Sequence, residues 1–273
     1  MFTIDKYVVA ESLEQAYQLN KSKKNKIIGG MLWLKMGRKK IGTAIDLSSL
    51  GLNTIDENDQ FFKIGCMCTL RDMETNKSLN KYFNNLFKLS LENIVGVQMR
   101  NLATIGGSIY SRFGFSDILT ALLVLDTYVE LHKGGLISLE KYMDMPLDND
   151  ILINIIIKKD NRKSNFSSLR LSATDFPVLT CAISNKGYEW YAAIGARPLQ
   201  AKISKFTLKP EPNNTEITKA ISTALENISF GSNMRASKQY REILASVFMK
   251  RGIEKVLYED ENEAENGGGN NGN

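Results

Sequence analysis

The sequence predicts an α+β protein, in which helices and strands are mixed along 273 residues. Hydrophobic residues make up 43% of the chain and charged residues 24%, a composition that can bury the cores of two or three compact units. Two apolar runs end in paired glycines, within residues 27–30 and 104–108, where a strand is expected to pass into a loop. From about residue 163 onward, strand-like segments follow one another directly.

Residues 1–55 predict a small α/β lobe. Residues 12–15, with the sequence SLEQ, have the pattern of a capping box that opens a short helix. The lysine-rich stretch 21–26 ends that helix, and residues 27–28 predict a strand that runs into the first glycine pair. A second strand over residues 43–47 completes the lobe.

Residues 56–162 predict a second lobe of strands and helices. The strands are runs rich in β-branched or aromatic residues: 61–65, 128–132, 136–139 and 150–157. Helices are expected after Thr69, with an apolar pattern through residues 82–89, and after Ser116. Residues 118–125 are apolar nearly all round, which is typical of a buried helix.

Residues 163–258 predict a third unit of sheet and helices. Its strands are three apolar stretches, the last two joined by an NKG turn: 166–171, 176–184 and 188–194. Two helices close the unit, and the last, over residues 237–258, is expected to carry five apolar side chains on one side: Tyr240, Ile243, Leu244, Val247 and Phe248. Residues 259–273 are acidic and then only Gly and Asn, so we expect a disordered tail.

Charge and cysteine content narrow the function classes. Lys and Arg outnumber Asp and Glu by 35 to 30, but the densest basic run, residues 21–26, has no interleaved aromatic residues, so nucleic-acid binding is not expected. The three cysteines, Cys66, Cys68 and Cys181, form no Cys/His cluster, which argues against a metal centre on this chain. His132 lies in a strand-like run without a nucleophile motif, and we assign no catalytic residue.

The chain shows no membrane or export signal. Its start lacks the basic stretch and apolar run of a signal peptide, and no uncharged apolar segment reaches ~18 residues. We therefore expect a cytoplasmic protein without membrane contact.

The glycine pairs predict a nucleotide site. Glycine has no Cβ and tolerates positive φ, so its backbone can approach a ligand and donate N–H groups to the oxygens of a diphosphate. Thr104 and Ser108 offer hydroxyl donors beside the second pair. The chain contains neither GxGxxG nor GxxxxGK[ST], so a nucleotide site must rest on another fold.

Three separated segments resemble one protein family. Residues 98–108, QMRNLATIGGS, followed by SD at 116–117 and ALLVLD at 121–126, resemble the Q-x-R-N-x-A-T-I-G-G-N … S/A-D … A-L-L-A-L-D signature of the FAD-binding medium subunits of molybdenum hydroxylases. These are the xanthine dehydrogenase and carbon monoxide dehydrogenase flavoproteins. The first glycine pair matches that family's A-G-G-T-D-L segment in position, and residues 232–241, SNMRASKQYR, resemble its D-x-R-A/G-S-x-x-Y-R stretch. The resemblance covers about residues 1–258.

The resemblance implies a two-lobed vanillyl-alcohol-oxidase-type FAD-binding fold followed by a C-terminal flavoprotein domain of sheet and helices. It places FAD between the two lobes, with the diphosphate at the glycine pairs. The implied cofactor-binding residues are Ile28, Gly29, Gly30, Met31, Leu32, Trp33, Ile94, Thr104, Ile105, Gly106, Gly107, Ser108, Asp117, Leu152 and Arg170. Asp117 corresponds to an acid at the adenosine part of FAD, whereas Ile94, Leu152 and Arg170 correspond to two apolar contacts and a cation near the flavin ring.

The resemblance also implies a function and leaves an alternative open. It implies a flavoprotein oxidoreductase subunit whose FAD, held without a covalent tether, receives electrons from partner subunits and passes them to NAD or another acceptor. The partners carry the molybdenum cofactor and [2Fe–2S] clusters, and the complex acts on a purine or another N-heterocycle. However, Met31 and Leu32 replace polar residues of the family and Ser108 replaces a common Asn, which removes donors for phosphate. The alternative is a non-catalytic scaffold or assembly subunit of the same complex with weak flavin occupancy.

Overall fold

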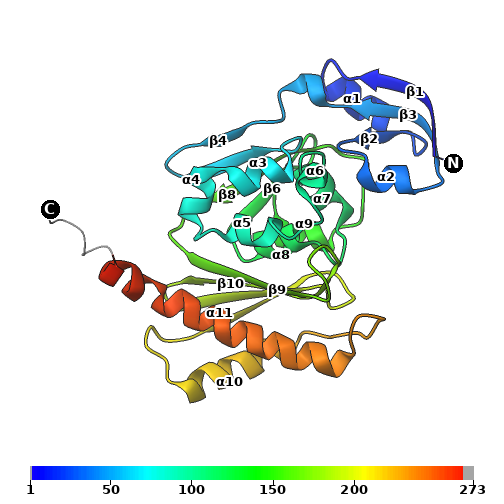
Figure 1. Ribbon diagram of the computed structural model, residues 1–273. Helices are drawn as coiled ribbons and strands as arrows, with labels where there is room; N and C mark the ends of the chain where they lie inside the picture. The colour runs from blue at the N-terminus through cyan, green and yellow to red at the C-terminus, as the bar shows by residue number, and fades with distance from the viewer. Residues whose placement is uncertain (1, 267–273) are drawn as a thin grey trace, which may run out of the picture.

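The computed structural model describes the backbone of residues 2–266 and the side chains as far as residue 258. Helices and strands are mixed throughout, which confirms the predicted class. The strands form three sheets, and Figure 1 shows them one above another, with the first sheet at the top and α10 and α11 beneath the third. None of the helices described is long and apolar enough to cross a membrane.

The first sheet is parallel, with strand order β1-β3-β2. Its unit consists of β1 (Thr3–Val9), α1 (Leu13–Asn20), β2 (Lys26–Ile28), α2 (Leu32–Met36) and β3 (Lys40–Asp46). The Ser12 hydroxyl caps α1, as predicted, by accepting a hydrogen bond from the Gln15 N–H. The capping box is not closed, because the Gln15 side chain accepts from the Glu11 N–H instead of the Ser12 N–H. The sequence pattern did not predict β1 or α2.

The second sheet is antiparallel, with strand order β4-β5-β8-β6-β7. Its strands are β4 (Ile55–Glu57), β5 (Phe61–Gly65), β6 (Thr127–Leu131), β7 (Gly135–Ser138) and β8 (Leu152–Lys158). Between them in sequence lie α3 (Leu70–Thr75), α4 (Lys77–Tyr82), α5 (Leu86–Leu91), α6 (Val97–Arg100), α7 (Ile105–Ser111), α8 (Asp117–Leu123) and α9 (Leu139–Asp144). The predicted helix starts at Thr69 and Ser116 are confirmed by their capping hydrogen bonds, and every residue of α8 is buried.

The third sheet is also antiparallel and has helices packed against both faces. It comprises β9 (Lys163–Arg170), β10 (Pro177–Lys186), β11 (Glu189–Gly195) and β12 (Lys202–Thr207). One hydrophobic core fills the space between the second sheet and its helices, and it extends to the face of the third sheet that α8 contacts. The other face of that sheet is covered by α10 (Asn214–Leu225) and α11 (Lys238–Asn266), as Figure 1 shows. A second core lies between that face and the two helices.

The apolar face predicted for the last helix is divided in the structure. Leu244 and Phe248 pack into the second core, whereas Tyr240, Ile243 and Val247 are exposed, Ile243 by 65%. The side of α11 that packs against β10 is buried, and the three exposed residues lie on the opposite side of the helix. The helix continues to residue 266, and the remainder of the predicted tail lies outside the described residues.

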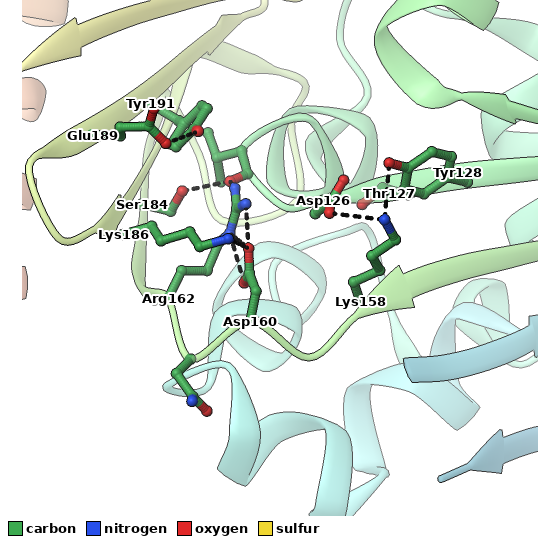
Figure 2. Close-up of polar contacts among 12 residues, drawn as sticks. Asp126, Thr127, Tyr128, Lys158, Asp160, Arg162, Ser184, Lys186, Glu189 and Tyr191 are labelled. Carbon is green, nitrogen blue, oxygen red and sulfur yellow. Dashed lines mark hydrogen bonds and ion pairs between the residues drawn. The ribbon is translucent and has the colours of Figure 1, made fainter. Parts of the chain in front are cut away.

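A buried ion pair fixes the link between the second and third sheets (Figure 2). The Arg162 Nε lies 2.9 Å and 3.0 Å from the two Asp160 carboxylate oxygens, and its Nη1 donates to the Val124 carbonyl at 2.6 Å. The guanidinium also lies 4.7 Å from the centre of the Tyr191 ring on β11, and Lys186 Nζ lies 3.5 Å from Asp160. These contacts hold β9 and β11 against the end of α8.

Candidate functional site

An open cavity of about 540 Å³ lies between α2, the α6–α7 segment and the β9–β10 loop. This volume falls within the range of roughly 300–1,000 Å³ that small-molecule sites occupy. A smaller cavity of about 110 Å³ lies beside it, and Gly29, Thr104 and Gly107 line both. The two glycine pairs therefore meet at the boundary between the two cavities.

The first glycine pair allows backbone contact between the first sheet unit and the segment before α7. A Cβ on Gly30 would lie 1.8 Å from the Leu102 carbonyl oxygen, and a Cβ on Gly29 would lie 2.5 Å from Thr104 Oγ1. Neither glycine adopts a positive φ. The left-handed residue is Met31, with φ of 58°.

The second glycine pair lies in the first turn of α7, not at the end of a strand as predicted. Thr104 caps this helix through the Gly107 N–H, and the Ser108 N–H donates to the Thr104 carbonyl. The Gly106 N–H donates to Cys66 O at 2.9 Å, and a Cβ on Gly106 would lie 2.7 Å from that oxygen. The Ser108 hydroxyl also donates to Thr104 O. The N–H groups of this first turn and the Ser108 hydroxyl thus donate within the protein, whereas the Thr104 hydroxyl accepts.

The first pair provides the donors that the second lacks. Within the part of the chain that the structure describes, the backbone N–H groups of residues 29–32 have no hydrogen-bond partner. All four residues line the larger cavity. Consecutive unpaired N–H groups around a left-handed residue form a concave anion site, or nest, which suits phosphate oxygens. An apolar side chain at Met31 or Leu32 leaves these backbone donors in place.

Four aromatic side chains from three parts of the chain meet in the wall of the larger cavity. Trp33 of α2 lies 5.2 Å and 5.4 Å, between ring centres, from Phe113 and Phe115 of the α7–α8 loop. It stacks at 6.0 Å on Phe176, which follows β9. Trp33 and Phe176 are each 39% exposed, so a planar ligand ring in the cavity has aromatic faces to contact.

Asp117 and Arg170 form a buried ion pair in the same wall. Arg170 Nη2 lies 2.8 Å from Asp117 Oδ1, and both side chains are less than a tenth exposed. Burial raises the pKa of the Asp117 carboxyl to about 6, although Arg170 acts in the opposite direction. Both residues line the larger cavity, and their roles at the adenosine part of FAD and near the flavin ring stay predictions.

The structure brings fourteen of the fifteen predicted cofactor residues to the two cavities. The larger cavity is lined by Gly29, Gly30, Met31, Leu32, Trp33, Ile94, Thr104, Gly107, Ser108, Asp117 and Arg170, and the smaller one also by Ile28, Gly106 and Leu152. Ile105 is fully buried and lines neither. Sequence reasoning missed Phe113, Phe115, Phe176 and Val95, which also line the larger cavity.

The three cysteines are free thiols, and all three are buried. Burial raises the pKa of Cys66 and of Cys68 to about 12, so both stay protonated and unreactive at neutral pH. No group of three or more His, Cys, Asp or Glu side chains in the described chain is arranged to hold a metal ion.

Comparisons with known proteins point to a flavoprotein family. A family model described as the FAD binding domain in molybdopterin dehydrogenase matches residues 2–159. The uncharacterized protein YgfM of Escherichia coli K12 is 25% identical over 258 residues, which cover 90% of this chain and 94% of YgfM. The xanthine dehydrogenase FAD-binding subunit of E. coli O157:H7 is 26% identical over 192 residues, covering 60% of this chain and 63% of that subunit.

Two solved structures share the fold. Carbon monoxide dehydrogenase from Hydrogenophaga pseudoflava superposes with a TM-score of 0.82 at 17% identity, over 92% of this chain and 96% of that one. Quinoline 2-oxidoreductase from Pseudomonas putida 86 superposes with a TM-score of 0.80 at 18% identity, over the same shares of the two chains. At this level of identity the likeness shows a common architecture.

Proposed function

The chain belongs to the family of FAD binding domains in molybdopterin dehydrogenases, and from this membership we propose that it is the electron-transferring flavoprotein subunit of a molybdenum hydroxylase of the xanthine dehydrogenase type. In this proposal, partner subunits carry the molybdenum cofactor and the [2Fe–2S] clusters. Electrons pass from the clusters to FAD on this chain and leave to NAD or another acceptor. We expect the complex to be cytoplasmic and to act on an N-heterocycle.

The observation that carries the proposal is the set of N–H groups at residues 29–32, which have no partner among the described residues and belong to residues that line the larger cavity. We infer that they bind the diphosphate of FAD, because consecutive backbone donors can satisfy its oxygens without a lysine. The apolar and aromatic remainder of the cavity suits the ring systems of the cofactor. When bound, FAD supplies the redox chemistry, while the protein positions it and limits the access of water.

We also propose how the sheets correspond to functional units. Residues 1–55 and 56–162, which contain the first and second sheets, form the two lobes of a vanillyl-alcohol-oxidase-type FAD-binding fold. Residues 163–258 form the C-terminal flavoprotein domain, and Arg170 and Phe176 bring that domain to the cavity wall. The cofactor would thus touch all three units.

The alternative is a scaffold or assembly subunit with weak flavin occupancy. Two observations favour it: the apolar Met31 and Leu32, and the engagement of every first-turn N–H of α7 within the protein. Both reduce the number of donors open to a diphosphate. The two functions differ in one measurable quantity, the ratio of flavin to protein in the intact complex.

The test is purification of the chain after co-expression with the proteins encoded beside it. The electron-transfer role predicts about one FAD per chain, released by acid, together with molybdenum and iron on co-purifying chains. A flavin content far below one per chain in an otherwise complete complex would support the scaffold role. Purine-dependent dye reduction by the isolated chain, in the absence of molybdenum, would contradict both roles.

A further inference from the structure

One wall of the larger cavity is formed by a strained turn. Val95 lies in the left-handed region, with φ of 47°, and it lines the cavity together with its neighbour Ile94. A β-branched residue is the least suited to this conformation, because its Cβ crowds the backbone. Val95 is 52% exposed, so its own packing does not account for the strain. Such a conformation persists only where surrounding contacts impose it.

The turn is bonded to Arg100, at the end of α6. Arg100 Nη1 donates to the Ile94 carbonyl at 2.9 Å. The rest of the guanidinium is anchored by a bidentate bond to Glu74 of α3, with Nε at 2.6 Å and Nη2 at 3.1 Å from the two carboxylate oxygens. Arg100 is only 5% exposed and lines neither cavity, so it reaches the cavity only through the turn.

The anchor itself is rigid and charged. Burial alone would raise the pKa of Glu74, but hydrogen bonds from Arg100 and Arg71 outweigh it and lower the pKa below its ordinary value. Glu74 therefore remains a carboxylate at neutral pH and holds Arg100 in a fixed orientation. Arg71 binds the same carboxylate, with its Nη1 2.8 Å from Glu74 Oε1, but the Arg71 side chain is 37% exposed to solvent.

We propose that Arg100 is a positioning residue for the flavin: through the Ile94 carbonyl it holds the turn at residues 94–95 in its strained conformation, as a fixed apolar wall beside the cofactor rings. This inference rests on the proposed FAD site. A wall that cannot relax keeps its contacts with a bound ring and excludes water from it, and both effects strengthen binding and tune the potential of the flavin. Arg100 acts through the turn and does not touch the cofactor.

The test compares Arg100→Lys with Arg71→Gln. Lysine keeps the charge beside Glu74 but cannot span both Glu74 and the Ile94 carbonyl, so FAD should bind about tenfold more weakly, as expected for the loss of one buried, charge-assisted bond. The midpoint potential of the bound flavin should shift as well. Arg71→Gln removes a cation from the same carboxylate without reaching the turn, and it should change FAD affinity by less than about twofold. Hydrogen exchange over residues 92–97 should rise only in Arg100→Lys.

Val95→Gly distinguishes positioning from simple stability. Glycine adopts the left-handed region freely, so the turn should keep its conformation in the double variant Arg100→Lys, Val95→Gly. FAD should bind to the double variant about fivefold more tightly than to Arg100→Lys, because a left-handed non-glycine residue costs about 1 kcal/mol. If Arg100→Lys fails to fold, Glu74→Gln, which keeps an acceptor for Arg100, takes its place with the same expected rescue.

The inference is overturned if folded Arg100→Lys binds FAD with unchanged affinity and potential, if Arg71→Gln causes an equal loss, or if Val95→Gly restores nothing. Failure of the wild-type chain to bind FAD would instead remove the proposed function. The exchange of residues 92–97 would then still report whether Arg100 holds the turn.

Discussion

Gly107→Val separates a role in cofactor binding from a role in folding. Gly107 is the third residue of α7 and lines both cavities. A Cβ at this position would meet one atom within 4 Å, Thr104 Oγ1 at 3.1 Å, and otherwise open space. A valine side chain would therefore extend into the region that we assign to the FAD diphosphate.

The expected magnitudes differ for stability and for binding. Replacing a helical glycine gains about 0.5–1 kcal/mol, and weakening the Thr104 cap costs about the same, so the free energy of unfolding should change little. In the complex, the same methyl groups must displace the cofactor. Overpacking of this kind costs about 1–3 kcal/mol, which weakens FAD binding by roughly fivefold to 150-fold.

The assay measures the melting temperature of the apo-protein and the dissociation constant of FAD for Gly107→Val and a control, Gly106→Val. In the control, the new Cβ would lie 2.7 Å from both the Cβ and the carbonyl oxygen of Cys66, so loss of folding stability is expected. The reasoning is refuted if Gly107→Val melts like the wild type and binds FAD with the same affinity.

Three further predictions concern other parts of the site and its support. Trp33→Leu should weaken FAD binding by about 0.5–1.5 kcal/mol, measured by calorimetric titration, because it removes one aromatic face from the cavity. Folding raises the pKa of the Asp117 carboxyl from 3.8 to about 6, so its protonation favours the folded state. This stabilisation is fully present below pH 4 and is lost as the pH rises through 6. Urea unfolding between pH 4 and 7 should show this loss, about 3 kcal/mol, in the wild type but not in Asp117→Asn. Arg241→Lys should destabilise the chain by about 3 kcal/mol, because the fully buried guanidinium donates to four oxygens. Arg235→Lys, at a partly exposed ion pair, should cost less than about 1 kcal/mol in the same unfolding assay.

Local patterns predicted the elements that the core buries. The β8 strand was predictable because β-branched residues follow one another along it, and the α8 helix because its residues are apolar on nearly every side. In contrast, β1 has only two partly buried positions among seven, so its sequence carries little strand signal. The five-residue α2 has no buried residue and no side-chain cap, and its placement depends on packing against the 102–104 segment.

The site was predicted by motif and completed by contacts distant in sequence. The glycine pairs led to residues that line the two cavities, but whether the Gly106 N–H is free depends on Cys66, which lies 40 residues before it. The aromatic wall joins Trp33 to Phe176, and the ion pair joins Asp117 to Arg170. Such pairings follow from the packing of separate units, which one sequence does not encode in any local pattern.

Hydrogen exchange at residues 29–34, with and without FAD, tests the central claim most directly. The unpaired N–H groups of residues 29–32 should exchange rapidly in the apo-protein, because they are bonded to no acceptor among the residues that the structure describes. Saturating FAD should slow this exchange strongly, while the first turn of α7, already hydrogen-bonded, should change far less. Unchanged exchange over residues 29–34 at full flavin occupancy would contradict the proposed diphosphate site.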